Sequence, residues 1–162
     1  MSLFLRFEEV PSFAFTGFHR RTNLLQETMT SSWRSLRQRK QEIMGCADDC
    51  FYSVQVYDSP DYFMQFQPEQ LFDQWAAVRV NEGSVVPDGM QQFLSPGGLY
   101  AVFRHRGTPA QFAQTAQFIF GRWLPQSGCV LDHRPHFERM APGYRPDDPE
   151  AEEEVFIPVQ KL

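Results

Sequence analysis

Apolar residues recur every three or four positions in two stretches of the chain, which is the spacing of an amphipathic helix. The first stretch spans about residues 24–44 and ends before Gly45, a good C-terminal cap. The second spans about residues 109–124, follows Thr108 as a good N-cap, and ends at Pro125. The apolar stripes are Leu25, Met29, Trp33, Leu36 and Ile43 in the first, and Phe112, Thr115, Ala116, Ile119, Phe120, Trp123 and Leu124 in the second. We therefore predict two principal helices.

Around these helices, apolar and polar residues alternate, as expected of strands that bury one face. The alternation covers about residues 3–20, 51–57, 62–67, 73–80, 90–94, 100–105, 133–140 and 153–159. Turn-forming residues such as Pro60 and Gly83 separate several of these segments. Gly17, inside the first segment, suggests a β-bulge.

The same order of elements, strand–helix–strand–strand, occurs twice. The halves span about residues 1–84 and 85–162. A duplicated unit of this kind buries each helix against one continuous antiparallel sheet and leaves a cleft near its pseudo-twofold axis. We therefore predict one domain over residues 1–162 with an α+β fold, two main helices on one face of the sheet, and a central cleft.

Composition and charge narrow the classes of function. A chain of 162 residues is long enough for one domain with a substantial core. A net charge of −5 argues against a nucleic-acid-binding surface, and we interpret the one basic run, Arg34 to Lys40, as the solvated face of a helix. No apolar run approaches 18 residues and the N-terminus does not resemble a signal peptide. We expect a cytoplasmic protein with no membrane contact and no direct nucleic-acid binding.

Metal and cofactor chemistry lack sequence support. The chain has 3 Cys and 4 His, but none has metal-ligand spacing supported by further ligands. It has no glycine-rich phosphate loop and no nucleophile elbow. We expect no metal and no cofactor.

Acidic residues beside aromatic residues are the candidate chemistry. Glu138 follows Phe137, and Glu154 lies two residues before Phe156. A carboxylate in a low-dielectric cleft is costly unless it meets a cation, and aromatic faces add cation–π attraction. This pattern indicates a pocket for a hydrophobic or cationic aromatic small molecule.

The strand pattern suggests which of these residues face the cleft. Glu154 shares strand parity with Phe156, whereas Val155 and Ile157 take the other face. If one face packs on the helices and the other lines the cleft, Glu154 faces the cleft. The aromatic candidates for the cleft lining are Phe13, Phe15, Tyr52, Trp75, Tyr100, Phe137 and Phe156 on strands, and Trp33 on the first helix.

Four motifs in the second half resemble those of a known family. They are Tyr-Ala-Val-Phe-x-His-x-Gly, a helix ending Trp-Leu-Pro-x-Ser-Gly, Pro-x-Phe-Glu, and a terminal Glu-Val-Phe-Ile-Pro-Val. In this order they resemble the GyrI-like small-molecule-binding domain, the effector-binding domain of many AraC-type and some MerR-type multidrug regulators. The resemblance covers residues 98–159 well, and the first half follows the element order.

The resemblance implies two strand–helix–strand–strand units around a central cleft that binds hydrophobic, often cationic, compounds against an acid. Glu138 and Glu154 match the positions of the family's acids. Met140 stands where the family often has Tyr, and Phe156 where it often has Trp or Tyr. The regulators carry a helix-turn-helix domain that we do not find in this sequence, so we expect a stand-alone module.

Three functions stay open. The leading interpretation is a binding module that senses or sequesters a hydrophobic cation. The first alternative, also implied by the resemblance, is a hydrolase of strained-ring alkylating toxins that uses a Glu and a Tyr. The candidates are Glu154 with Tyr100 or Tyr52. The second is a protein that interacts with and inhibits gyrase, for which the sequence shows no specific interface.

Overall fold

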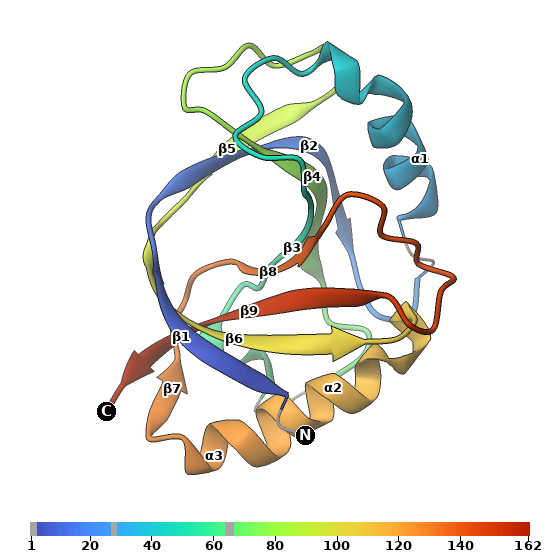
Figure 1. Ribbon diagram of the computed structural model, residues 1–162. Coiled ribbons are helices and arrows are strands. Elements are labelled where there is room, and N and C mark those ends of the chain that lie inside the picture. Colours follow the sequence, from blue (N-terminus) through green and yellow to red (C-terminus); the bar gives the residue numbers. More distant parts are fainter. Residues whose placement is uncertain (1–2, 27–28, 64–66) are drawn as a thin grey trace.

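The computed structural model describes residues 3–26, 29–63 and 67–162 and shows an α+β fold (Figure 1). The strands are β1 (Phe4–Val10), β2 (Phe13–Thr22), β3 (Phe51–Val56), β4 (Phe72–Val80), β5 (Gln91–Ser95), β6 (Gly98–Arg106), β7 (Cys129–Leu131), β8 (His136–Met140) and β9 (Glu152–Lys161). The helices are α1 (Thr30–Arg39), α2 (Phe112–Phe118) and α3 (Leu124–Gln126). Shorter helical turns are η1 (Lys40–Glu42), η2 (Pro60–Phe63), η3 (Pro109–Gln111) and the π-helical turn η4 (Ile119–Trp123).

All strand pairs in the described residues are antiparallel, and the sheet curls until it closes. The order is β1-β6-β9-β8-β3-β4-β2-β5, with β7 paired to β9. β1 runs on into β2 across Pro11, and β5 runs on into β6 across Pro96. β1 pairs with β6 and β2 with β5, so the two bent strands pair along most of their length. The two ends of the strand order therefore meet, and Figure 1 shows the resulting ring of strands.

The strand order has an internal twofold symmetry. If each strand of the first unit is replaced by the equivalent strand of the second unit, and the reverse, the order reads the same from the other end. β1, β2, β3 and β4 correspond to β5, β6, β8 and β9, and the axis that relates them passes between β3 and β8. Each unit consists of a bent strand, a helix and two further strands, where β1–β2 and β5–β6 are the bent strands and α1 and α2 are the helices. The short strand β7 is an addition in the second unit. The predicted α+β fold with a large antiparallel sheet and two main helices is confirmed.

Each face of the sheet buries its own core. The interior face carries an aromatic cluster around Phe15, Tyr52 and Phe156. The outer face carries one cluster under α1, around Leu36 and Ala76, and a second under α2, around Phe103 and Ile119. Both helices lie outside the ring of strands, on the outer face of the sheet (Figure 1).

Several local predictions need correction. The first helix begins at Thr30 rather than near residue 24, and Leu25 lies in a turn and is exposed. The strand expected at residues 62–67 is replaced by the turn η2 up to Phe63, and residues 64–66 lie outside the described part. Gly17 forms no bulge, because its pairing with Ala77 continues the regular register of β2 and β4.

Only half of the expected capping box is present, and α2 itself begins at Phe112, after the turn η3, with no side-chain cap hydrogen bond. The Thr108 backbone N–H donates to Oε1 of Gln111 at 2.8 Å. The predicted cap at Gly45 is wrong, because α1 ends at Arg39 and the turn η1 ends at Glu42 with Ile43 as its C-cap. Gly45 adopts φ +79 in the loop that follows.

Candidate ligand-binding site

A cavity of about 690 Å³ opens on the outer face of the sheet beside α1. This volume lies within the usual range of small-molecule sites. The middle strands β3, β4 and β8 form its floor, α1 and residues 22–26 form one wall, and the loop between β8 and β9 contributes Tyr144 and Pro146. The lining residues are Thr22, Asn23, Leu24, Gln26, Met29, Thr30, Trp33, Arg34, Arg37, Gln38, Ser53, Gln55, Phe72, Gln74, Glu138, Met140, Tyr144, Pro146 and Glu153.

The floor of the cavity is polar at its centre. Gln55 Nε2 donates to Glu138 Oε2 at 2.9 Å and to Ser53 Oγ at 3.1 Å, and Gln74 Nε2 donates to the same hydroxyl at 2.8 Å. Ser53 pairs with Glu138 across β3 and β8, so the pseudo-twofold axis passes through this group. Hydrogen bonds hold the Glu138 carboxylate in place although its side chain is almost fully buried.

A second acid, Glu153, lies beside the first. Glu138 pairs with Val155 across β8 and β9, so Glu153 is its diagonal neighbour on the same face of the sheet. Burial raises the pKa of Glu138 above its usual range. Burial and the negative charge of Glu138 raise the pKa of Glu153, while a hydrogen bond with Tyr144 opposes that rise. The two carboxyl groups therefore hold a proton at near-neutral pH more readily than ordinary glutamates do.

Glu154, which the sequence pattern assigned to the cleft, lies on the opposite face. Its carboxylate pairs with Arg6 Nη1 at 2.8 Å and with Arg139 Nη2. Burial alone would raise the pKa of Glu154, but the hydrogen bonds from Arg6 and Arg139 outweigh burial and lower it. The prediction assumed that the cleft and the helices occupy opposite faces. In the structure they share one face, so the residue with the parity of Val155 and Ile157, Glu153, lines the cavity.

The strand aromatics predicted for the cleft are buried together on the interior face. Phe13, Phe15, Tyr52, Trp75, Tyr100, Phe137 and Phe156 all belong to the interior cluster and do not line the cavity beside α1. Trp33 on α1 is the predicted aromatic that does line it.

The two predicted tyrosines are occupied by internal hydrogen bonds. Tyr100 donates to the carbonyl oxygen of Pro135 at 2.8 Å, and Tyr52 donates to Asp48 Oδ2 at 2.7 Å. Burial raises the pKa of Tyr100 to about 12. Neither hydroxyl reaches the cavity, whereas Tyr144, which no sequence pattern indicated, does.

Three polar residues of the cavity floor could have been identified from the sequence. Ser53, Gln55 and Gln74 interrupt strands that are otherwise largely apolar, and the first two share parity with Phe51. A polar residue on a helix-facing strand position indicates a gap in the helix layer. Tyr144 lies in a loop with no periodic pattern and could not be found in this way.

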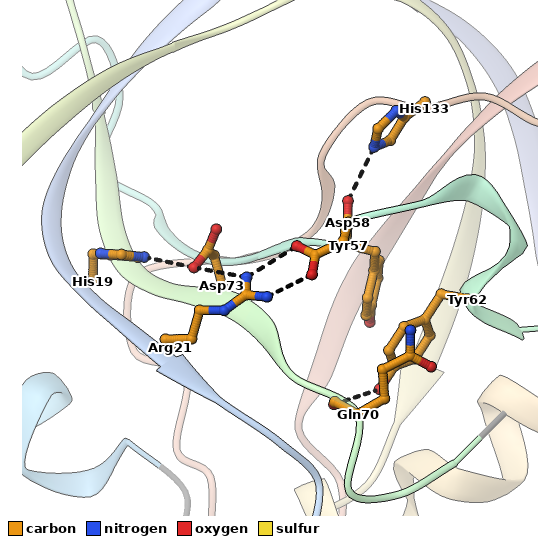
Figure 2. A network of polar contacts seen from close by, with 8 residues as sticks. All are labelled: His19, Arg21, Tyr57, Asp58, Tyr62, Gln70, Asp73 and His133. Atoms are coloured by element: carbon orange, nitrogen blue, oxygen red, sulfur yellow. Dashed lines mark hydrogen bonds and ion pairs between the residues drawn. The ribbon is translucent and has the colours of Figure 1, made fainter.

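A separate polar network lies where β2 ends and β4 begins. Arg21 Nη1 lies 3.0 Å from Asp58 Oδ1 and 3.4 Å from Asp73 Oδ1, and His19 Nε2 lies 3.0 Å from Asp73 Oδ1 (Figure 2). His133 Nε2 contacts the carbonyl oxygen of Tyr57 at 3.0 Å. These groups satisfy one another. Nearby, His19 and Trp75 border a shallow, open groove.

The described residues show neither a metal site nor a membrane-spanning helix. No group of three or more His, Cys, Asp or Glu side chains among residues 3–26, 29–63 and 67–162 is arranged to hold a metal ion. No helix within the same ranges is long and apolar enough to cross a membrane.

Comparison with known proteins supports a family assignment. A family model described as a GyrI-like small-molecule-binding domain matches residues 4–160. The transcriptional regulator BrlR of Pseudomonas aeruginosa PAO1 is 30% identical over 156 residues, which cover 95% of this chain and 54% of the regulator. The chain therefore spans about half the length of that protein.

Solved structures show the same fold at low sequence identity. SAV2435, solved bound to tetraphenylphosphonium, superposes with a TM-score of 0.68 at 13% identity and covers 96% of this chain and 93% of its own. EcmrR, from a complex with DNA, superposes with a TM-score of 0.69 at 14% identity, over 99% of this chain and 59% of its own. These similarities show that the chain shares the fold of both proteins.

Proposed function

Because the chain belongs to the GyrI-like small-molecule-binding family, we propose that it binds hydrophobic, cationic small molecules in the cavity beside α1. Glu138 and Glu153 balance the positive charge of the ligand, and Trp33 and Phe72 contribute apolar contact area. The single observation that carries the proposal is a pair of carboxyl groups inside a largely apolar cavity.

The electrostatic reason is the cost of burying the acids without a partner. Two neighbouring carboxylates in a low-dielectric cavity repel each other, which is why burial and their mutual charge raise the pKa of Glu153. A bound cation stabilises both ionised forms and displaces the shared proton. A neutral ligand of the same shape lacks this gain.

The relatives support the same reading. SAV2435 was solved with tetraphenylphosphonium, a hydrophobic cation, on the same fold. The similarity to BrlR supports a regulatory use, in which occupancy of the cavity is the signal that a transcription regulator in the cytoplasm responds to.

Titration calorimetry with tetraphenylphosphonium tests the proposal. We expect Glu138→Gln and Glu153→Gln each to weaken binding by about 1–3 kcal/mol, because each removes a buried charge partner. Binding near neutral pH should release protons, measured as a dependence of the heat on the ionisation enthalpy of the buffer. Affinity should increase as pH rises through the raised pKa values of the two acids.

Glu154→Gln is the matched control. It removes a neighbouring acid on the opposite face of the sheet, so affinity for tetraphenylphosphonium should not change. Unchanged affinity in both cavity variants, or a loss confined to Glu154→Gln, would contradict the proposed site.

A second candidate function is hydrolysis, favoured by the presence of Tyr144 and Glu153 in the lining of one cavity. A glutamate with a pKa raised towards neutrality can serve as a general base for water, with a tyrosine to orient it. Catalysed opening of a strained-ring electrophile, abolished in Glu153→Gln, would identify an enzyme rather than a binding module.

A further inference from the structure

Two arginines of α1 line the cavity. Arg34 and Arg37 both border it and are both exposed at their helix positions. Neither forms an ion pair with an acidic group in the described part of the chain. The basic run from Arg34 to Lys40 was interpreted from the sequence as a solvated helix face. Two of its arginines therefore belong to the cavity lining instead.

The next arginine along α1 provides an internal comparison. Arg39 pairs with Glu42, Nε to Oε2 at 2.8 Å, and its Nη2 donates to the carbonyl oxygen of Asp88 at 2.7 Å. Arg34 and Arg37 lie three residues apart, which brings like charges together on one side of the helix and is mildly destabilising. The contact of Arg37 with the Phe51 ring, 6.0 Å from the centroid, neutralises no charge.

The positive and negative groups occupy different depths of the cavity. Glu138 lies on the floor, in the centre of the sheet, and is 8% exposed, whereas the arginines are on the exposed helix at the side. Tyr144, from the loop between β8 and β9, lines the same cavity as Glu153 and the two arginines. A bound molecule that contacts Glu138 and Trp33 therefore has the guanidinium groups within reach.

Building on the proposed function, we infer that the preferred ligand is an aromatic zwitterion whose positive group meets Glu138 and Glu153 and whose carboxylate meets Arg34 and Arg37. A simple cation satisfies only the acids and is repelled by the arginines. A zwitterion satisfies both charged groups and relieves the repulsion between the two guanidinium groups. Arg34 and Arg37 are specificity-determining residues in this arrangement.

A matched pair of probes separates the two ligand classes. (4-Carboxybutyl)triphenylphosphonium is a zwitterion at pH 7.5, and its methyl ester is a cation with nearly the same shape. The ester is the more apolar probe, so a pocket that selected only for a hydrophobic cation would prefer it. We expect calorimetry at low ionic strength to show the zwitterion binding on the order of tenfold more tightly than the ester, as charge-assisted contacts to arginine require.

The double variant Arg34→Gln/Arg37→Gln should remove this preference and strengthen ester binding, because it removes the charges that repel the cation. Arg122→Gln, which removes an exposed arginine outside the cavity, should retain the preference. Ester binding equal to or tighter than zwitterion binding in the wild type would overturn the inference and leave the proposed function standing. A preference that survives in the double variant would overturn it too. If neither probe binds, both the inference and the proposed function fail.

Discussion

At the scale of single residues, the decisive feature is where charge is buried. Glu138 and Glu153 face the cavity with few compensating donors, whereas Glu154, one residue further along β9, is held between Arg6 and Arg139. The pKa values of these adjacent glutamates therefore shift in opposite directions. The pKa of Glu153 is raised and that of Glu154 is lowered. Strand alternation is the cause, because it directs neighbouring side chains to opposite faces.

The raised pKa values predict a pH dependence of stability. An acid with a higher pKa in the folded state binds more protons when folded, so the free energy of unfolding falls as pH rises between the unfolded and folded values. For Glu138 this window runs from 4.5 to about 7. Glu138→Gln mimics the protonated form, so it should match the wild type near pH 4.5 and exceed it by on the order of 2 kcal/mol at pH 7.5.

The measurement is urea denaturation at a series of pH values, taken as the difference between variant and wild type. Burial lowers the pKa of His136 to about 3, so His136 contributes stability that is lost as pH falls below 6.5. This contribution is the same in variant and wild type, so taking the difference between the two removes it. Glu9→Gln, on the exposed surface of β1, should show no such trend. A constant difference between Glu138→Gln and wild type across this range would contradict the assignment.

At the scale of elements, β2 approaches its neighbour β4 closely at a glycine. Gly17 pairs with Ala77, and a Cβ added to it would lie 2.0 Å from the Ala76 carbonyl oxygen. Backbone atoms cannot move aside as a flexible side chain can. Glycine is therefore required at this position by the closeness of β2 and β4, and not by a bulge.

Gly17→Ala should destabilise the protein by about 2–3 kcal/mol or more, as overpacking of a rigid site does. Gly121→Ala is the contrasting variant, because a Cβ at residue 121 meets nothing within 4 Å. That change should be neutral or stabilising by up to about 1 kcal/mol, since alanine favours helix. Urea midpoints of the two variants provide the comparison, and equal effects would show that the close approach at Gly17 has no energetic weight.

At the scale of the whole molecule, closure of the sheet joins the two pseudo-symmetric units. They meet between β3 and β8, and again where the bent strands β1–β2 and β5–β6 pair. The aromatic interior cluster draws residues from both units, including Phe15 and Phe156. Neither unit can lose its structure without exposing this shared core.

We therefore predict a single cooperative unfolding transition, as for other small domains. Two variants that each retain one tryptophan report on the units separately, since Trp33 packs on the first helix-face cluster and Trp123 on the second. Their urea transitions should coincide with each other and with the loss of far-ultraviolet circular dichroism. Two separated midpoints would show that the units unfold independently.

The sequence by itself determined the elements and most of their order. Periodicity located both helices and most strands because amphipathic patterns are local. It also singled out Glu138, whose position beside Phe137 on an alternating strand is visible without a fold. The segments it assigned wrongly, near residues 24 and 62, are irregular turns held by contacts with distant parts of the chain, such as the Leu24 N–H donating to the carbonyl oxygen of Pro68.

Only the tertiary structure decided which face of the sheet holds the cavity. The alternation of side chains along a strand predicts that Glu153 and Glu154 point to opposite faces. It does not predict which face has a gap between the helices. That depends on how far apart the pairing of β3 with β8 places α1 and α2, and on the interior being closed and filled by aromatic rings. Closure buried seven rings that the pattern had assigned to a ligand. It also left the acids Glu138 and Glu153, the polar floor and two arginines of α1 around the open cavity. These groups converge from strands and a helix far apart in sequence, so no local pattern could bring them together.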